Sequence, residues 1–368
     1  MATLMTERKR SALTRGRLPR YTPYVIAAAA IIIAAALMSL IGFNAFGWGV
    51  LSAILFAAGN VISSALVEGR RKAVDKLATS LVYGAFLIAL LPLVSVIWTV
   101  LVNGVPGLLT SGFLSTSMNG VTGAVDNAAV ANGTPVVGGV YHALVGSVLI
   151  TLWATLISVP VGLMTAIYLV EYSADNKFSR VITFLVDVMT GIPSIVAGLF
   201  AAAFFALIMG PGTKTGFVAA VALSVLMIPV VVRSSEEMLK IVPNELREAA
   251  YALGVRKWRT ITKVVIPTAI SGIASGVTLA IARVIGETAP LLVTAGFASS
   301  INMNVFAGWM SSLPTFIYTQ IMTPTSPSNA DPSTQRAWAA ALLLIILVML
   351  LNLGARLVAR IFAPKTGR

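Results

Sequence analysis

The 368-residue sequence has no cysteine, one histidine and only 13 acidic residues. Without cysteine the chain forms no disulfide, no iron–sulfur cluster and no thiol nucleophile. The single histidine, His142, excludes a metal cluster or a catalytic triad built on histidines, and its position predicts a solvated residue at a helix start. Charged residues make up 11% of the chain, against about 25% in ordinary soluble proteins. So few charged side chains are not enough to cover the surface of a water-soluble protein of this length.

Apolar residues, in contrast, are abundant and make up 57% of the chain. Crossing about 30 Å of hydrocarbon takes roughly 20 apolar residues in a helix. Eight stretches approach or exceed this length, near 24–41, 46–67, 77–101, 142–170, 181–209, 216–232, 271–298 and 337–359. The first follows basic residues as a secretory signal does, but it is longer than a signal core, and we expect a retained helix. The sequence therefore predicts an all-α polytopic membrane protein.

The basic residues lie in alternate loops between these stretches. All but three of the 26 Lys and Arg residues lie before the first stretch, after the last, or in the loops after the second, fourth and sixth. The exceptions are Lys214, Arg336 and Arg283, of which only Arg283 lies inside a stretch. Because positive loops stay in the cytoplasm, we expect both termini there. The net charge of +13 is then a topology signal, and nucleic acid is not needed to explain it.

Three segments are too polar to cross a membrane. Residues 102–141 and 299–335 are expected outer loops, the second with turn-forming prolines at 323–332.

Residues 210–215 come nearest to a phosphate-binding loop, but they lack the glycine before Lys214. If ATP is used, another polypeptide hydrolyses it.

The third segment, 233–270, is the largest cytoplasmic loop and the most patterned. Asn244 is an expected N-cap, with acidic residues in the first turn, and Gly254 suits the left-handed residue that ends a helix. The residues on one narrow apolar face are Leu246, Ala249, Ala250 and Leu253. A helix of about ten residues does not cross a bilayer, so it lies on the membrane surface or in the groove of a partner. The pattern alone does not choose between these two.

The loop also carries a recognisable spacing. Glu248-Ala249-Ala250, followed after three residues by Gly254 and after eleven more by Ile266-Pro267, resembles the EAA loop of ATP-binding-cassette importer permeases. In that family the loop is a coupling helix that docks on an ATPase subunit. The resemblance implies ATPase coupling by Glu248, Ala249, Ala250, Gly254 and Pro267.

The seventh stretch contains membrane-embedded charges. Arg283 and Glu287 are spaced i, i+4, which predicts one shared helix face. A charge in the bilayer costs about 2.5–3.5 kcal/mol on insertion scales, so each needs a partner or a wet cavity. One interpretation is a structural ion pair. The other is an anion site, because the guanidinium fork suits a tetrahedral oxyanion. Glu287 would then hold Arg283 and moderate its affinity, and Thr288 would add a donor.

Two further charges lie near the expected inner ends of other stretches. Arg233 ends the sixth stretch, where it is either a positive-inside anchor or part of an anion pathway. Asp187 lies early in the fifth stretch.

Three motifs narrow the resemblance. Residues 282–292 read Ala-Arg-Val-Ile-Gly-Glu-Thr-Ala-Pro-Leu-Leu and resemble the signature of the PstA family, one of the two permease families of phosphate importers. Residues 191–200 and 229–239 resemble two other motifs of the family. The sister family, PstC, shares the Arg…Gly-Glu-Thr core, and residues 289–292 favour PstA. The resemblance is strong over 143–298, extends over 77–361 and does not include 1–67.

The resemblance implies a type I importer permease with a six-helix core at 77–361, the EAA coupling loop at 233–270, two extra transmembrane helices at 24–67 and a basic cytoplasmic tail at 1–23. Such a chain is not an enzyme and binds no cofactor, since ATP and Mg²⁺ are used by the ATPase. The implied partners are a PstC-like permease, a PstB-like ATPase dimer and a PstS-like extracytoplasmic phosphate-binding protein, assembled at the bacterial cytoplasmic membrane. The implied pathway residues are Arg233, Arg283, Glu287 and Thr288.

Two other classes of protein share some of these features. A secondary anion carrier, with Arg283 and Glu287 as its coupling pair, leaves the EAA spacing unexplained. An intramembrane enzyme lacks a histidine cluster, a cysteine or paired membrane aspartates. The outer loop 102–141 offers a surface for a binding protein, although nothing in its chemistry demands one.

Overall fold

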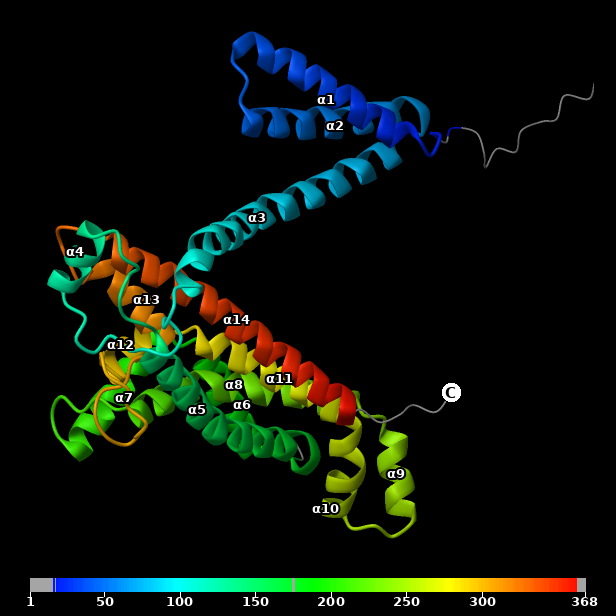
Figure 1. The fold of residues 1–368 in the computed structure, drawn as a ribbon. Coiled ribbons are helices and arrows are strands. Elements are labelled where there is room, and N and C mark those ends of the chain that lie inside the picture. Colours follow the sequence, from blue (N-terminus) through cyan, green and yellow to red (C-terminus); the bar gives the residue numbers. More distant parts are fainter. Residues whose placement is uncertain (1–15, 17, 174–175, 363–368) are drawn as a thin grey trace, which may run out of the picture. The chain divides into compact units, whose positions relative to one another are not determined.

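The computed structural model describes residues 16, 18–173 and 176–362, which form α-helices and two π-helical turns, without strands (Figure 1). The elements are α1 (Thr22–Ile41), α2 (Ala45–Val67), α3 (Arg70–Leu108), α4 (Gly123–Ala131), α5 (Tyr141–Ile167), η1 (Tyr168–Tyr172), α6 (Lys177–Thr190), α7 (Ser194–Met209), α8 (Gly216–Ile241), α9 (Asn244–Ala252), α10 (Lys257–Thr260), η2 (Ile261–Val265), α11 (Ile266–Ile285), α12 (Ala289–Thr294), α13 (Leu313–Met322) and α14 (Asp331–Phe362).

Within this described part, seven helical segments are long and apolar enough to cross a membrane. Helices α6 and α7 meet the same test only together, and they are bent by 108° at the break between them. The expected eight spans are therefore reached if this bent pair counts as one. The all-α polytopic class is confirmed.

The chain divides into two compact units, Met1–Trp98 and Thr99–Arg368. In the first unit α1 and α2 form a helical hairpin in which Gly59 lies directly against Ile26. After α2, Lys76 and Ser64 bond the carboxylate of Glu68 at 3.0 and 2.8 Å. These contacts lower the pKa of Glu68 to about 2, Lys76 contributing most. The end of the hairpin is thus fixed by an ionised carboxylate.

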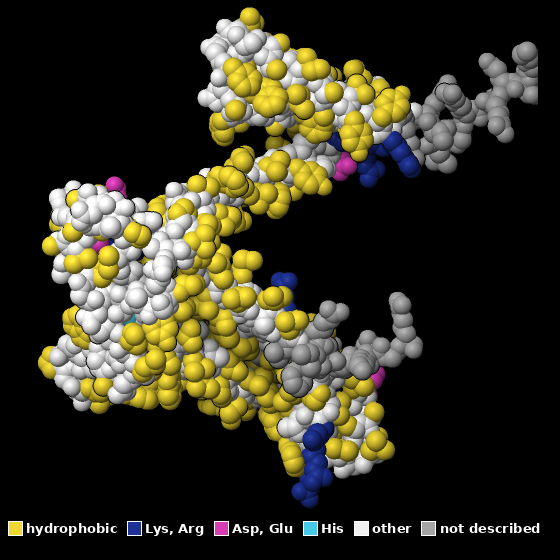
Figure 2. Space-filling model, viewed as in Figure 1, with side chains coloured by type: hydrophobic (Ala, Val, Ile, Leu, Met, Phe, Trp, Pro, Cys, Tyr) yellow, Lys and Arg dark blue, Asp and Glu magenta, His cyan; other side chains and the backbone are white. Residues whose placement is uncertain are grey.

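In the second unit α8 is the central helix and packs against α5, α7 and α11. Small residues allow this close approach: a side chain at Gly162 of α5 would lie 2.7 Å from Val231 of α8. Figure 2 shows apolar side chains over much of the visible face of the bundle and Lys and Arg gathered near α9 and α10. We call this the α9 end of the unit, and the opposite end, with α4, α12 and α13, the α4 end (Figure 1).

Three expected spans differ from the observed helices. The stretch 181–209 is interrupted at Gly191–Pro193, because Pro193 disfavours helical backbone in the residue before it. Within the stretch 271–298, helix α11 ends at Ile285, and residues 286–288 are not helical. Conversely, α8 runs on to Ile241, since the polar residues after Arg233 end the apolar run without breaking the helix.

The two segments expected to be outer loops contain helices. Helix α3 continues to Leu108, and α4 forms within 102–141. His142 does begin a helix, as the second residue of α5, but the prediction that it is solvated is wrong. It is only 2% exposed, and its ring packs edge-on against Phe316 of α13.

Candidate functional site

Arg283 lies in the last turn of α11, and its side chain is exposed. Within the described part of the chain it has no hydrogen bond or ion pair. Glu287 lies beyond the end of the helix, so the prediction that the two residues share a helix face is wrong. Gly286 ends α11, and a new helix begins with Pro290 in its first turn. A structural ion pair between Arg283 and Glu287 is therefore not formed, and no other described residue pairs with the guanidinium.

Two of the sequence motifs meet beside this break. Gly198 of α7 lies against Pro290 of α12, and a Cβ on Gly198 would approach the Pro290 Cα to 2.6 Å. Each helix begins directly after an interruption, at residues 191–193 and 286–288. Discontinuous membrane helices are typical of transporter substrate sites, because the interruption exposes polar backbone groups.

Arg233 is held by two carboxylates. Asp187 of α6 accepts a hydrogen bond from Nη2, and Glu236 accepts one from Nη1 at 2.8 Å. Glu236 is shared with Lys240 at 2.7 Å. The pairing with Asp187 joins residues 46 positions apart, so the local sequence pattern does not reveal it.

The two arginines lie at different levels of the same helix pair. Ser234, next to Arg233, packs against Gly276 of α11. Arg283 is seven residues further along α11, about 10 Å at 1.5 Å per residue. The structure therefore does not gather Arg233, Arg283, Glu287 and Thr288 into one cluster. It places Arg233 towards the α9 end and the other three beside the α11–α12 break.

Helix α9 forms as expected but starts one residue earlier than predicted. Pro243 is the N-cap, and the Asn244 side chain accepts a hydrogen bond from Arg247 at 3.2 Å instead of capping. Of the expected apolar face only Ala250 is buried, whereas Leu253 is 83% exposed. Glu248 and Ala249 are also exposed. Of the EAA sequence, Glu248 and Ala249 are thus available to a partner, whereas Ala250 faces the chain's own interior.

Gly254 ends α9 in the left-handed conformation, with φ +72°. The amide of Val255 donates to Ala250 O at 3.1 Å, and that of Gly254 donates to Tyr251 O at 2.9 Å. These are the two bonds of a Schellman motif. Pro267 lies at the start of α11, directly after the π-helical turn η2. Because a proline ring clashes with the carbonyl four residues earlier, the wider turn accommodates it.

We predict that Gly254→Val uncouples or detaches the ATPase that the resemblance to the EAA loop implies as a partner. A β-branched residue does not tolerate this φ, so the end of α9 must change its course. The measurement is co-purification of the ATPase and substrate-stimulated ATP hydrolysis. Gly84→Val in α3, where the glycine is helical with open space around it, is the matched control. Unchanged coupling in Gly254→Val would contradict the docking role of this turn.

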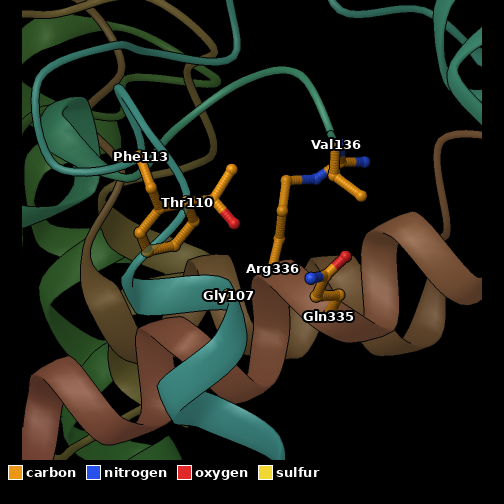
Figure 3. A pocket seen from close by; sticks show the side chains of 6 residues that line it. All are labelled: Gly107, Thr110, Phe113, Val136, Gln335 and Arg336. Atoms are coloured by element: carbon orange, nitrogen blue, oxygen red, sulfur yellow. The ribbon is translucent and has the colours of Figure 1, made fainter. Parts of the chain in front are cut away.

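Sequence reasoning missed a buried ion pair at the α4 end. Arg336 of α14 is 1% exposed and bonds both carboxylate oxygens of Asp126 in α4, at 2.9 and 2.6 Å. Its Nε donates to Gln320 at 2.9 Å and its Nη1 to the Val137 carbonyl at 2.9 Å. Figure 3 shows Arg336 extending from α14 towards Val136 beside a small cavity that Thr110 and Phe113 also line. The available signal was that Arg336 is one of only two basic residues in the expected outer loops.

These features define a polytopic membrane permease. An arginine without a partner among the described residues lies beside interrupted helices, and a short helix is open to a partner. A family model described as "Binding-protein-dependent transport system inner membrane component" matches residues 158–368, and the chain belongs to this family. It is a multi-pass protein of the bacterial inner membrane.

Several named relatives are similar over most of their length. "Phosphate transport system permease protein PstA 1" of Mycobacterium tuberculosis is 47% identical over 289 residues, which are 78% of this chain and 90% of the relative. "Phosphate transport system permease protein PstA" of Mycobacterium leprae is 47% identical over 287 residues, 78% of this chain and 89% of the relative. Among solved structures, an inward-facing MetNI methionine ABC transporter aligns with 61% of this chain and 94% of its own, at 23% identity and a TM-score of 0.48.

Proposed function

We propose that this chain is a permease subunit of an ATP-driven phosphate importer and forms part of the path for inorganic phosphate. The observation that carries the proposal is the 47% identity to a phosphate transport system permease over 90% of that relative. The aligned length is sufficient for a whole permease, so the similarity is not limited to the coupling loop.

The chemistry of the site supports an anion as substrate. Arg283 offers a planar fork of hydrogen-bond donors and has no partner in the described chain. Glu287 and Thr288 lie in the interruption next to it. Arg233 provides a second guanidinium about 10 Å along the helix pair, restrained by Asp187 and Glu236. An anion that leaves Arg283 next meets Arg233, for which Asp187 and Glu236 compete. This competition weakens binding of the anion at Arg233 and favours its release.

The proposed assembly follows from the two ends of the unit. The loop 233–270 at the α9 end is rich in Lys and Arg, and so are the segments next to both termini, so the positive-inside rule favours a cytoplasmic location for all three. An ATPase dimer docks there on the exposed face around Glu248 and Ala249, and it uses ATP and Mg²⁺, so this chain needs no catalytic residue or cofactor. A second permease of the PstC type completes the path, and an extracytoplasmic phosphate-binding protein delivers phosphate at the α4 end.

The test is reconstitution of the chain with the second permease, the ATPase and the binding protein in proteoliposomes. We expect uptake of radiolabelled phosphate that requires internal ATP and external binding protein and that persists when ionophores collapse ion gradients. Uptake that needs a gradient and no ATP would instead establish a secondary anion carrier. Uptake of another solute in preference to phosphate would reject the proposed substrate.

A further inference from the structure

Helix α9 is attached to the rest of the chain by more than its two connecting segments. Arg247, on the side of α9 that faces the bundle, is mostly buried, and Glu171 of the π-helical turn η1 is buried beneath it. Arg247 donates from Nε and Nη2 to Glu171 Oε1 at 3.0 and 2.8 Å. The pair joins positions 76 residues apart and ties α9 to the end of α5.

The same guanidinium also binds the end of α8. Its Nη2 donates to the Leu239 carbonyl at 3.0 Å, and its Nη1 donates to the Val242 carbonyl at 2.6 Å. These carbonyls belong to the last turn and the C-cap of α8, where no further helical amide bonds them. One side chain of α9 therefore holds the ends of two membrane spans at once.

The surroundings of this pair are closely packed. Leu239 and Val242 pack in an apolar cluster with Ala166 of α5 and Val265 of η2. A second contact to the same π-helical turn comes from α10, where Lys257 lies over the Tyr172 ring of η1, 5.0 Å from its centre. Helix α5 in turn makes the most extensive helix contact of the unit, with α8. A displacement of α9 thus reaches the end of α5 without passing through the chain connections.

We propose that Glu171 and Arg247 form a brace that transmits movement of α9 to α5 as well as to α8. Both are positioning residues that touch neither substrate nor ATP, and the role rests on the proposed importer function. In the importer the ATPase moves α9, the brace carries α5 and α8 together, and the pathway beside them changes its access. Without the brace α9 moves on its two short connections, so ATP hydrolysis is no longer converted into transport.

The first experiment compares Arg247→Met with wild type in the reconstituted complex. We expect the ATPase still to co-purify, because its docking face is unchanged, while stimulation of ATP hydrolysis by the loaded binding protein and phosphate uptake each fall at least tenfold. Glu171→Gln, which keeps the shape and one acceptor oxygen, should lose less. Lys177→Gln, which removes an exposed charge from α6, is the control and should behave like wild type. Normal stimulation and uptake in Arg247→Met would overturn the brace.

A second experiment separates transmission from folding. Because the chain has no cysteine, Glu171→Cys with Arg247→Cys provides a unique reactive pair. This double variant should be uncoupled, and bridging the two thiols with a short bifunctional thiosulfonate should restore stimulated hydrolysis and uptake at least fivefold. A bridged complex that stays uncoupled, or variants that all fail to retain the ATPase, would overturn the proposal. If the wild-type complex couples ATP hydrolysis to the uptake of another solute, phosphate is rejected as the substrate. The brace is then tested by comparing stimulated hydrolysis and uptake of that solute between each variant and wild type.

Discussion

Arg283→Gln should abolish phosphate uptake while leaving the complex assembled. The Arg283 side chain is exposed at the end of α11 and contacts no other described side chain through a hydrogen bond or ion pair, so its loss leaves no buried group without a partner. What is lost is the charged donor fork for the anion. Truncating one partner of a desolvated charge pair costs about 2–5 kcal/mol, which corresponds to roughly 30-fold to several thousand-fold in uptake.

The measurements are uptake of radiolabelled phosphate, co-purification of the ATPase and basal ATP hydrolysis in the same preparation. Arg71→Gln, which makes the identical change at an exposed position of α3, is the matched control and should transport normally. Arg283→Lys should retain part of the uptake, because lysine keeps the charge but not the planar fork. Normal uptake by Arg283→Gln would reject the assignment of this residue to the pathway.

The apolar runs of the sequence predicted which segments enter the membrane but not where their backbone is continuous. Hydropathy reports the preference of side chains for lipid, and apolar residues lie on both sides of the interruptions at 191–193 and 286–288. The interruptions depend on backbone geometry at Gly191, Pro193, Gly286 and Pro290, and glycine and proline are also tolerated inside membrane helices. The placement of Glu287 on a helix face failed for this reason.

Local chemistry predicted the turn at Gly254 correctly because everything that decides it lies within a few residues. A helix that ends on glycine with φ +72° needs only its own last carbonyls. The partners of the charged residues are a different matter. Arg233, Arg247 and Arg336 each bind an acid far away in the sequence, and the separations are 46, 76 and 210 positions. Such pairs follow from the packing of helices, which no local pattern encodes.

Arg336→Met should destabilise the second unit strongly. The change leaves the Asp126 carboxylate buried among groups that do not neutralise it, and removing one member of a buried ion pair costs about 3–5 kcal/mol. The free energy of unfolding, measured in detergent micelles by denaturant titration, should fall by this amount. Lys72→Met is the control: it removes the exposed Lys72 from its 3.7 Å contact with Glu68, whose carboxylate keeps Lys76 and Ser64 as partners, so the loss should be about 0–1 kcal/mol.

A second substitution identifies the origin of the loss. In Arg336→Met with Asp126→Asn the buried charge is gone, so part of the stability should return, although Gln320 and the Val137 carbonyl still lack their donor. If Arg336→Met and Lys72→Met lower the free energy of unfolding equally, the Arg336–Asp126 pair does not contribute to the stability of the fold as proposed. Because Arg336 is 1% exposed, it does not reach a substrate in the pathway, and folded Arg336→Met complex should transport phosphate at the normal rate per molecule. The two arginine variants therefore have opposite expected phenotypes: Arg336→Met loses stability and keeps transport, whereas Arg283→Gln keeps stability and loses transport.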